Sequence, residues 1–334
     1  MAADRIIYAL QNVAIDGLQN GDYTFMKGIQ SVSMSTNFNL EQVFQFGQLN
    51  IFENTEGVPD IEMSVSKVLD GSALLYTTAT SGNDLGLVTA SDRNFNTVLG
   101  LWDETLFNNA TGEPTHMVML SGCSVSSIGY NFSVDGPFTE DMSIQANNKI
   151  WAGNCARYNL SLESWPTAYT GDSPDAAGGV QNRRAFDKAN CTLPSIIPEG
   201  KSRIQSIGVS CDFGLEPLSE LGSYTPYARK ASFPIEVTCD IEVITTGGDK
   251  VNATESGCAT GALTQCSVVS NLSNESIVIR TCDGTNLNLG AKNKLSSVQY
   301  GGGDAGGGNS TVTYSFSNFN DLLVSGSGTF ARNV

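Results

Sequence analysis

An internal duplication constrains the fold of this 334-residue chain more than any other feature of its sequence. The segment from Gly28 to Glu41 matches the segment from Arg203 to Glu216, and every matched pair lies 175 positions apart, as 29 and 204 do. The identical pairs are Ile29 and Ile204, Gln30 and Gln205, Ser31 and Ser206, Ser35 and Ser210, Phe38 and Phe213, Leu40 and Leu215, and Glu41 and Glu216. Such a run of identities indicates two copies of one ancestral unit.

Later blocks keep the same order while their spacing drifts slowly, to 174 and then to 170 positions. These blocks are Ile61 to Val65 with Ile235 to Cys239, Ser126 to Tyr130 with Ser296 to Tyr300, and Met142 to Ile144 with Val312 to Tyr314. We therefore predict a first repeat over residues 1–165, a connector over 166–200 and a second repeat over 201–334. Residues 170–179 are rich in Gly, Asp and Ala, which favours a flexible connector.

The composition and the local patterns favour an all-β fold. The chain has 35 Gly but only 10 Pro, and Ser, Thr and Asn are frequent. Ile61, Met63 and Val65 alternate with polar residues, as expected for a half-buried strand. One stretch, 94–107, places apolar residues at near-helical spacing, so we expect one amphipathic helix packed on a sheet. Its apolar residues are Phe95, Val98, Leu99, Trp102 and Leu106. Around residues 253–269 the second repeat is poorer in apolar residues, and we expect its helix to be reduced or missing.

Charge and motif content weigh against several function classes. The formal net charge of −16 and the absence of any Lys/Arg run weigh against sequence-specific nucleic-acid binding. His116 is the only histidine, and the eight cysteines include no Cys-x-x-Cys pair, so a metal site has almost no support and we expect free buried thiols. No nucleophile–base or phosphate-loop motif occurs, and the glycine-rich run from Gly301 to Gly308 is interpreted as a turn between strands. We expect a protein that is not an enzyme and that has no cofactor.

The sequence also bears on where the protein is made and kept. No segment approaches the ~18 apolar residues needed to span a bilayer. The amino-terminal residues lack the basic start and cleavage site of a secretory signal. We therefore expect synthesis in the cytoplasm and no membrane association.

Three segments resemble the tail proteins of bacteriophages. They run from Val58 to Gly71, from Phe132 to Trp151, and from Lys294 to Tyr300 together with Thr311 to Phe319. The resemblance covers both repeats and is to the major tail tube protein, in the duplicated form found in long non-contractile tails. It implies two tandem β-sandwich or half-barrel domains that oligomerise into a continuous β-barrel ring. It also implies homotrimeric, pseudo-hexameric rings that stack into a tube, with a hexamer of chains as the other arrangement.

The resemblance also implies partners and surfaces. The partners would be other copies of the chain, the tape measure protein and genome DNA in the lumen without sequence-specific binding, and other tail proteins at the tube ends. The location would be the virion tail, assembled in the host cytoplasm. Candidate lumen-facing carboxylates, which would repel phosphates, are Glu62, Glu236, Asp240 and Glu242, and each could equally be ordinary solvated surface. Candidate ring-stacking residues are Phe44, Phe46, Leu49, Ile51 and Phe52 in the stretch 44–57, which could equally be a core strand.

Two other functions stay open at this point. One is another virion part, such as a tail terminator, a neck ring or a capsid decoration protein, which would not polymerise into tubes. The other is a host-binding β protein at the tail tip, for which exposed aromatic clusters in loops would be expected, although the chain has only three Trp.

Overall fold

The computed structural model describes residues 11–19, 23–82, 85–102, 114, 116–153, 179–197, 202–245, 251, 274–303 and 308–326. Within this part the chain is nearly all strand, with two one-turn helices, α1 (Leu75–Ala79) and α2 (Leu87–Ser91). The strands are β1 (Gln11–Asp16), β2 (Thr24–Phe25), β3 (Ile29–Asn37), β4 (Leu40–Phe44), β5 (Ile51–Glu56), β6 (Asp60–Val68), β7 (Phe95–Leu101), β8 (His116–Ser133), β9 (Thr139–Ala146), β10 (Asn148–Gly153), β11 (Ser202–Asp212), β12 (Leu215–Leu218), β13 (Ala228–Ala231), β14 (Glu236–Thr245), β15 (Val278–Arg280), β16 (Asn286–Asn288), β17 (Lys294–Gly301), β18 (Thr311–Phe319) and β19 (Leu323–Ser325). The expectation of an all-β fold is confirmed.

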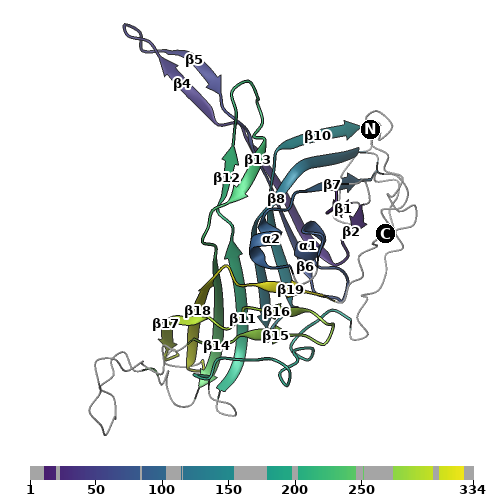
Figure 1. Ribbon diagram of the computed structural model, residues 1–334, viewed down its shortest axis with the longest axis vertical. Helices are drawn as coiled ribbons and strands as arrows, with labels where there is room; N and C mark the ends of the chain where they lie inside the picture. Colours follow the sequence, from purple (N-terminus) through teal and green to yellow (C-terminus); the bar gives the residue numbers. More distant parts are fainter. Residues whose placement is uncertain are drawn as a thin grey trace.

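One wide antiparallel sheet organises the molecule (Figure 1). Eight strands follow the order β3-β6-β9-β8-β11-β14-β18-β17, and every pairing between neighbours is antiparallel. The long strand β8 continues past this sheet, and its first half pairs with β7 and β10, while β7 pairs with β1. The helices and the small β15-β16-β19 sheet lie against the eight strands, and the apolar core fills the space between them. None of the helices among the described residues has the length and apolar character that a membrane crossing requires.

The first four and the last four strands of this sheet pair in the same order. β3-β6-β9-β8 repeats as β11-β14-β18-β17. Four register shifts lie at matched places: between Ile29 and Ser31, between Ile204 and Ser206, between Val125 and Ser127, and between Leu295 and Ser297. Because β-bulges interrupt a ladder at defined positions, shared bulges are a sharper similarity than shared strand order. The shifts in β3 and β11 lie 175 positions apart, and those in β8 and β17 lie 170 positions apart. These are the spacings found in the sequence.

For the other two strands of each set, the pairing differs by two positions from the alignment of the sequence. Ile29 lies opposite Lys67 and Ile204 lies opposite Val243, so β6 and β14 correspond at 176 positions instead of 174. By the same comparison, β9 and β18 correspond at 172 positions instead of 170. A shift of two residues keeps each side chain on the same face of the sheet, so apolar alternation alone could not fix the alignment.

The prediction of a helix over residues 94–107 is wrong, because residues 95–101 form strand β7. β7 lies inside a sheet between β1 and β8, and both of its faces are covered, so Phe95, Thr97, Val98 and Leu101 are all buried. A strand buried on both faces carries a nearly continuous apolar run that imitates helical spacing. Leu106 and the stretch 253–269 lie outside the described residues.

The described part of the connector, residues 179–197, is packed in place. Gln181 donates its backbone N–H to Leu69 O (2.7 Å) and accepts one from Phe138, both in the first repeat. Thr192 forms an isolated bridge with Val278 of the second repeat. Residues 179–197 are therefore tied by backbone hydrogen bonds to both repeats, and residues 170–178, on which the expectation of a flexible connector is based, lie outside the described residues.

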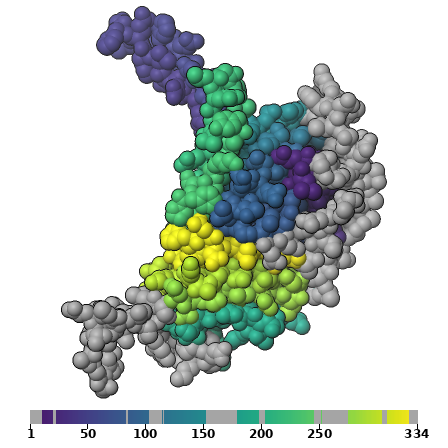
Figure 2. Space-filling view, viewed as in Figure 1, coloured from purple at the N-terminus to yellow at the C-terminus, as the bar shows by residue number. Residues whose placement is uncertain are grey.

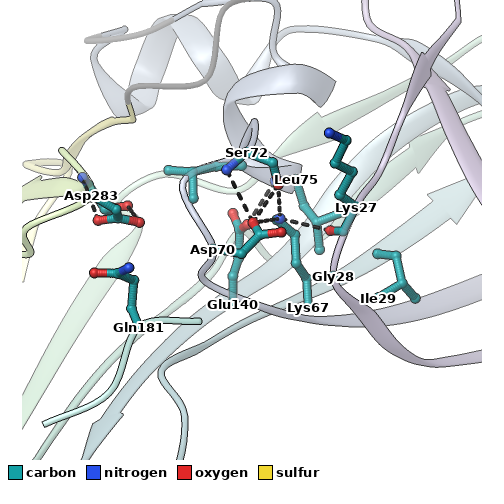
Figure 3. A network of polar contacts seen from close by, with 12 residues as sticks. Lys27, Gly28, Ile29, Lys67, Asp70, Ser72, Leu75, Glu140, Gln181 and Asp283 are labelled. Atoms are coloured by element: carbon teal, nitrogen blue, oxygen red, sulfur yellow. Dashed lines mark hydrogen bonds and ion pairs between the residues drawn. The ribbon is translucent and has the colours of Figure 1, made fainter. Parts of the chain in front are cut away.

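A buried polar network distinguishes the first repeat from the second (Figure 3). The Lys67 ammonium is fully buried and donates to Asp70 Oδ1 (2.9 Å), Ser72 Oγ (2.6 Å) and Lys27 O (2.8 Å). Burial alone would raise the pKa of Asp70, but the ion pair with Lys67 and the hydrogen bonds from Lys67 and Ser72 hold it below its usual value. The network anchors the turn that leads from β6 into α1.

Glu140 lies opposite Lys67 on the neighbouring strand β9. Its carboxylate accepts the backbone N–H groups of Leu75 (2.7 Å) and Tyr76 (3.0 Å) at the start of α1, and the hydroxyl of Tyr130 (2.9 Å). Burial raises the pKa of Glu140, and these hydrogen bonds act against that rise. All of these partners lie inside the fold, so Lys67 and Glu140 hold α1 in place.

At the corresponding pair in the second repeat, Val243 lies opposite Val312. We predict that Lys67→Val lowers the free energy of unfolding by about 3–5 kcal/mol, because it leaves the buried carboxylates of Asp70 and Glu140 without their cation. Glu140→Val should also lower it, because the buried N–H groups of Leu75 and Tyr76 and the Tyr130 hydroxyl lose their acceptor. The double variant should lose clearly less than the sum of the two, with a coupling of about 1–3 kcal/mol. Urea unfolding of the four chains measures this coupling. Strictly additive losses would contradict the account of the pair.

Candidate functional site: an open sheet face, its two edges and a projecting hairpin

One face of the eight-stranded sheet carries the core and the other is open and polar. Along β14, Val237, Cys239 and Ile241 are buried, while the residues between them are exposed or half-exposed. The open face is composed mainly of Ser, Thr, Gly, Asn and Gln, and its carboxylates are Asp60, Glu62, Asp141, Asp212, Glu236, Asp240 and Glu242. Among the described residues of these eight strands, the cations that share this face are Arg203 and Lys294. The face is therefore acidic, and its side chains are short.

All four of the carboxylates selected from the sequence lie on this face. Glu62, Glu236 and Asp240 are exposed, and Glu242 is half-buried and accepts a hydrogen bond from Ser206 Oγ (3.1 Å). That these carboxylates face a lumen remains a proposal.

Sequence reasoning missed three further carboxylates of the face, Asp60, Asp141 and Asp212. For Asp141 a signal was present in the alternation of β9, where polar residues separate Met142 and Ile144.

A hollow of about 360 Å³ lies at the middle of the open face. It is lined by residues of β8, β9, β11 and β14, so it crosses the line where the two repeats meet. Asp141, Asp212 and Glu236 place three carboxylates around it, and Gly129 contributes no side chain to fill it. The face is hollowed and negatively charged where the two repeats join.

The two ends of the eight-stranded sheet are free in the described part of the chain. β3 pairs with β6 on one side, β17 pairs with β18 on one side, and no described strand covers the other side of either. Their core-facing side chains are accordingly half-exposed or exposed, including Met34 on β3 and Tyr300 on β17. Unpaired strand edges present backbone donors and acceptors to another chain, and proteins normally cover or block them.

Inside the chain, the counterparts of these two edges are already paired with each other. β8 corresponds to β17 and β11 corresponds to β3, and β8 and β11 form the antiparallel junction between the repeats. At this junction Tyr130 lies opposite Val209, and each is 2% exposed. Tyr300, the counterpart of Tyr130, is 53% exposed. The chain therefore contains one complete junction and both halves of a second one.

Strands β4 and β5 form a two-stranded hairpin that stands clear of the rest of the molecule (Figures 1 and 2). The five candidate ring-stacking residues all lie in it: Phe44, Phe46, Leu49, Ile51 and Phe52. All five are exposed, and Phe46 and Leu49 at the tip are fully so. The alternative of a core strand is therefore wrong for the single chain, since no apolar side chain of this set is buried. Exposed apolar groups at this density mark a surface that binds a partner.

The second repeat has a matching hairpin, β12–β13, which is not free. Arg229 donates from Nε to Asn147 Oδ1 (3.0 Å) and from Nη1 to Gln145 Oε1 (3.1 Å), and Lys230 forms an ion pair with Asp92. The three acceptors belong to the first repeat. The hairpin of repeat two therefore lies on repeat one, which Figure 2 shows as the green segment against the blue one.

Fold and site together define an all-β protein built on one wide antiparallel sheet with two free edges, an acidic open face and a projecting apolar hairpin. No protein-family model and no curated protein matches the chain. Chains from the two solved assemblies that follow are among those similar to part of it. One is a chain of the sheath–tube complex of an extracellular contractile injection system, PVC, in its extended state, with 13% identity, a TM-score of 0.32, and coverage of 45% of this chain and 93% of that one.

The other is a chain of the baseplate of the anti-feeding prophage (AFP), with 10% identity, a TM-score of 0.28, and coverage of 45% of this chain and 96% of that one. At such scores the likeness carries no argument about function.

Proposed function

We propose that this chain is the structural subunit of a phage-type tail tube, which closes into rings by joining the free edge β17 of one copy to the free edge β3 of the next. The observation that carries the proposal is the β8–β11 junction, because it joins the counterparts of those two edges within one chain. Repeating one junction around a ring leaves no unpaired edge, which removes the aggregation hazard of open sheets.

The internal junction supplies a register for the joint between copies. Ile128 lies opposite Cys211, and Tyr130 lies opposite Val209. Transferred by the 170- and 175-residue correspondences, these pairs place Val298 opposite Thr36 and Tyr300 opposite Met34 of the next copy. Core-facing side chains then meet core-facing ones, and the apolar layer continues from copy to copy.

In such a ring the open face lines the passage. Its short side chains leave the passage clear, and its carboxylates repel phosphates, so DNA passes without being held. Three chains per ring, giving six repeats, and stacking of the rings are the arrangement that the resemblance to duplicated tail tube proteins implies. The tape measure protein and the genome would be the contents of the lumen, and other tail proteins the partners at the ends. The role is structural and not enzymatic.

Negative-stain electron microscopy of the purified protein at high concentration tests this function. We expect stacked rings with a central hole that lengthen into tubes, and three copies on rotational averaging. Discrete monomers would overturn the proposal. Single rings that never stack would also overturn the tube assignment, and would favour a terminator, neck or decoration protein.

A further inference from the structure

Phe38 and Phe213 hold the same place in the two repeats but lie in opposite environments. Each directly follows the first strand of its matched set of four, β3 or β11, and precedes the hairpin. The residue after each has left-handed backbone, with φ of 46° at Asn39 and 54° at Gly214, so the chain turns the same corner twice. Phe213 is completely buried, whereas Phe38 is 57% exposed. Repeat one thus leaves open the contact that Phe213 makes in repeat two.

The contact of Phe213 is with the other repeat. Its N–H donates to Ser126 O on β8 (2.9 Å), and its ring lies 6.3 Å from the ring of Tyr76 on α1, centroid to centroid. Both partners belong to repeat one. Its own carbonyl accepts the N–H of Ser232 (3.1 Å), which ties the base of the β12–β13 hairpin to the same point. Phe213 therefore anchors its hairpin on the neighbouring repeat.

The two hairpins share their register as well as their anchor. Leu215 pairs with Ala231 as Leu40 pairs with Glu56, each partner 175 positions from its counterpart. The tips also correspond, with φ of 92° at Gly222 and 90° at Gly47.

One face of β12–β13 lies against the molecule. Leu215 and Ala231 on this face pack at the border of the core, and Arg229 beside them is buried. The same face of β4–β5 carries Leu40 and Phe44, which are 61% and 63% exposed. Leu40 corresponds to Leu215, whereas the counterparts of Arg229 and Ala231 are the exposed residues Asn54 and Glu56. This face therefore presents one apolar side chain at a position that meets a neighbouring repeat in the other hairpin, and Phe44 lies farther along the same face.

We propose that Phe38 and this face of the β4–β5 hairpin dock on the second repeat of an adjacent copy in the same ring, as Phe213 and β12–β13 dock on the first repeat within the chain. The inference rests on the proposed ring and names a contact that the ring itself does not require. Phe38 and the hairpin face would contact the same neighbouring copy. The copy whose β17 would pair with β3 presents its second repeat directly beside Phe38.

The landing site follows from the same correspondences. The counterpart of Ser126, whose carbonyl receives Phe213, is Ser296 on β17. The counterparts of Gln145 and Asn147, which receive Arg229, are Ser317 and Phe319 on β18. Phe319 is 58% exposed, so an apolar side chain stands at the place where the apolar hairpin would arrive. In repeat two the side chain that meets these two amides is Arg229, and its counterpart in repeat one is Asn54, which would arrive beside Ser317 and Phe319.

This docking divides the hairpin into two parts. Its base, from Phe38 to Phe44, would lie on the neighbour within the ring. Its tip, with Phe46 and Leu49, would remain available for a contact along the tube axis. Replacing a base residue and replacing a tip residue should therefore have different effects on ring closure.

Photo-crosslinking tests the contact directly. A benzophenone amino acid is placed at position 38 in the full chain, and ¹⁵N-labelled and unlabelled chains are mixed before assembly. We expect mass spectrometry to find position 38 joined to residues 294–301 or 315–319, in pairs of one labelled and one unlabelled chain. A matched probe at position 46 should not reach these residues.

The outcomes separate the two proposals. Absence of rings would overturn the proposed function and this inference with it. Rings in which position 38 links elsewhere, or links to nothing, would overturn the docking and leave the proposed function standing.

A substitution gives a second, independent readout. We expect Phe38→Ala to raise the concentration needed for ring formation by about tenfold or more, since it removes a central aromatic anchor. Its unfolding midpoint as a monomer should stay unchanged, because Phe38 is exposed in the single chain. Leu49→Ala at the tip is the matched control and should leave single rings intact. A Phe38→Ala chain that forms rings at the wild-type concentration would contradict the anchor.

Discussion

Replacement of Tyr300 by lysine is expected to abolish ring formation while the isolated chain stays folded. Tyr300 is 53% exposed on the free edge β17, so the monomer should lose less than about 0.5 kcal/mol. In the joined sheet it would take the environment of Tyr130, which is 2% exposed, and a lysine there would be buried without a partner. A penalty of about 3 kcal/mol per junction corresponds to about a hundredfold loss of affinity. Analytical ultracentrifugation and electron microscopy measure the loss.

Two matched variants make this test specific. Tyr300→Phe keeps the apolar ring and should assemble as the wild type does. Adding Met34→Glu to Tyr300→Lys places opposite charges across the proposed joint, and assembly should recover in part. Val88→Lys puts the same charge on the exposed side of α2 and should have no effect. Assembly of Tyr300→Lys at the wild-type concentration would exclude β17 as an interface.

Reversal of the charge on the open face is expected to turn a passage that repels DNA into one that holds it. The variant combines Glu62→Lys, Glu236→Lys, Asp240→Lys and Glu242→Lys. Because these side chains point away from the core, tubes should still form. Duplex DNA present during assembly should become enclosed and protected from nuclease, and the protection should fall steeply as salt rises between about 50 and 200 mM. Wild-type tubes should protect none.

A neutral series separates charge from side-chain shape. Changing the same four positions to Gln or Asn should remove the repulsion without creating retention, so protection should stay near the wild-type level. Lysine tubes that enclose no more DNA than wild-type tubes would show that this face does not line the passage.

The sequence predicted the fold class, because strand alternation is a local signal. Register was harder to predict, since a shift of two residues in β14 or β18 changes no side chain from buried to exposed. Strand β7 was missed for a different reason. Coverage on both faces is a property of the tertiary structure, and Val98 and Leu99 alone cannot distinguish a doubly covered strand from a helix.

The candidate site was predictable in its parts and not in its arrangement. Glu62 and Glu236 could be selected from strands with clear alternation, and the apolar stretch around Phe46 was visible as an anomaly. No sequence pattern shows that β8 and β11 pair, because that contact joins residues far apart in the chain. The matched identity of Phe38 and Phe213 likewise hid their difference, since exposure depends on which repeat has a neighbour within the same chain.

The buried pair of Lys67 and Glu140 also escaped prediction. In the sequence each is one polar residue within an otherwise alternating strand, and the valines at their counterparts in repeat two give no hint of a charge. Only the register between β6 and β9 brings them face to face.

Disulfide trapping tests the joint between β17 and β3 most directly. In the double variant Met34→Cys/Tyr300→Cys, the two sulfurs of adjacent copies would stand opposite each other, as Tyr130 and Val209 do within the chain. After mild oxidation of assembled rings, a non-reducing gel should show a ladder that ends at three chains, with peptide mapping of the 34–300 bond and no such ladder in the wild type or either single variant. A chain that assembles but forms no 34–300 bond would contradict the proposed junction, and a ladder that continues to six would contradict three copies per ring.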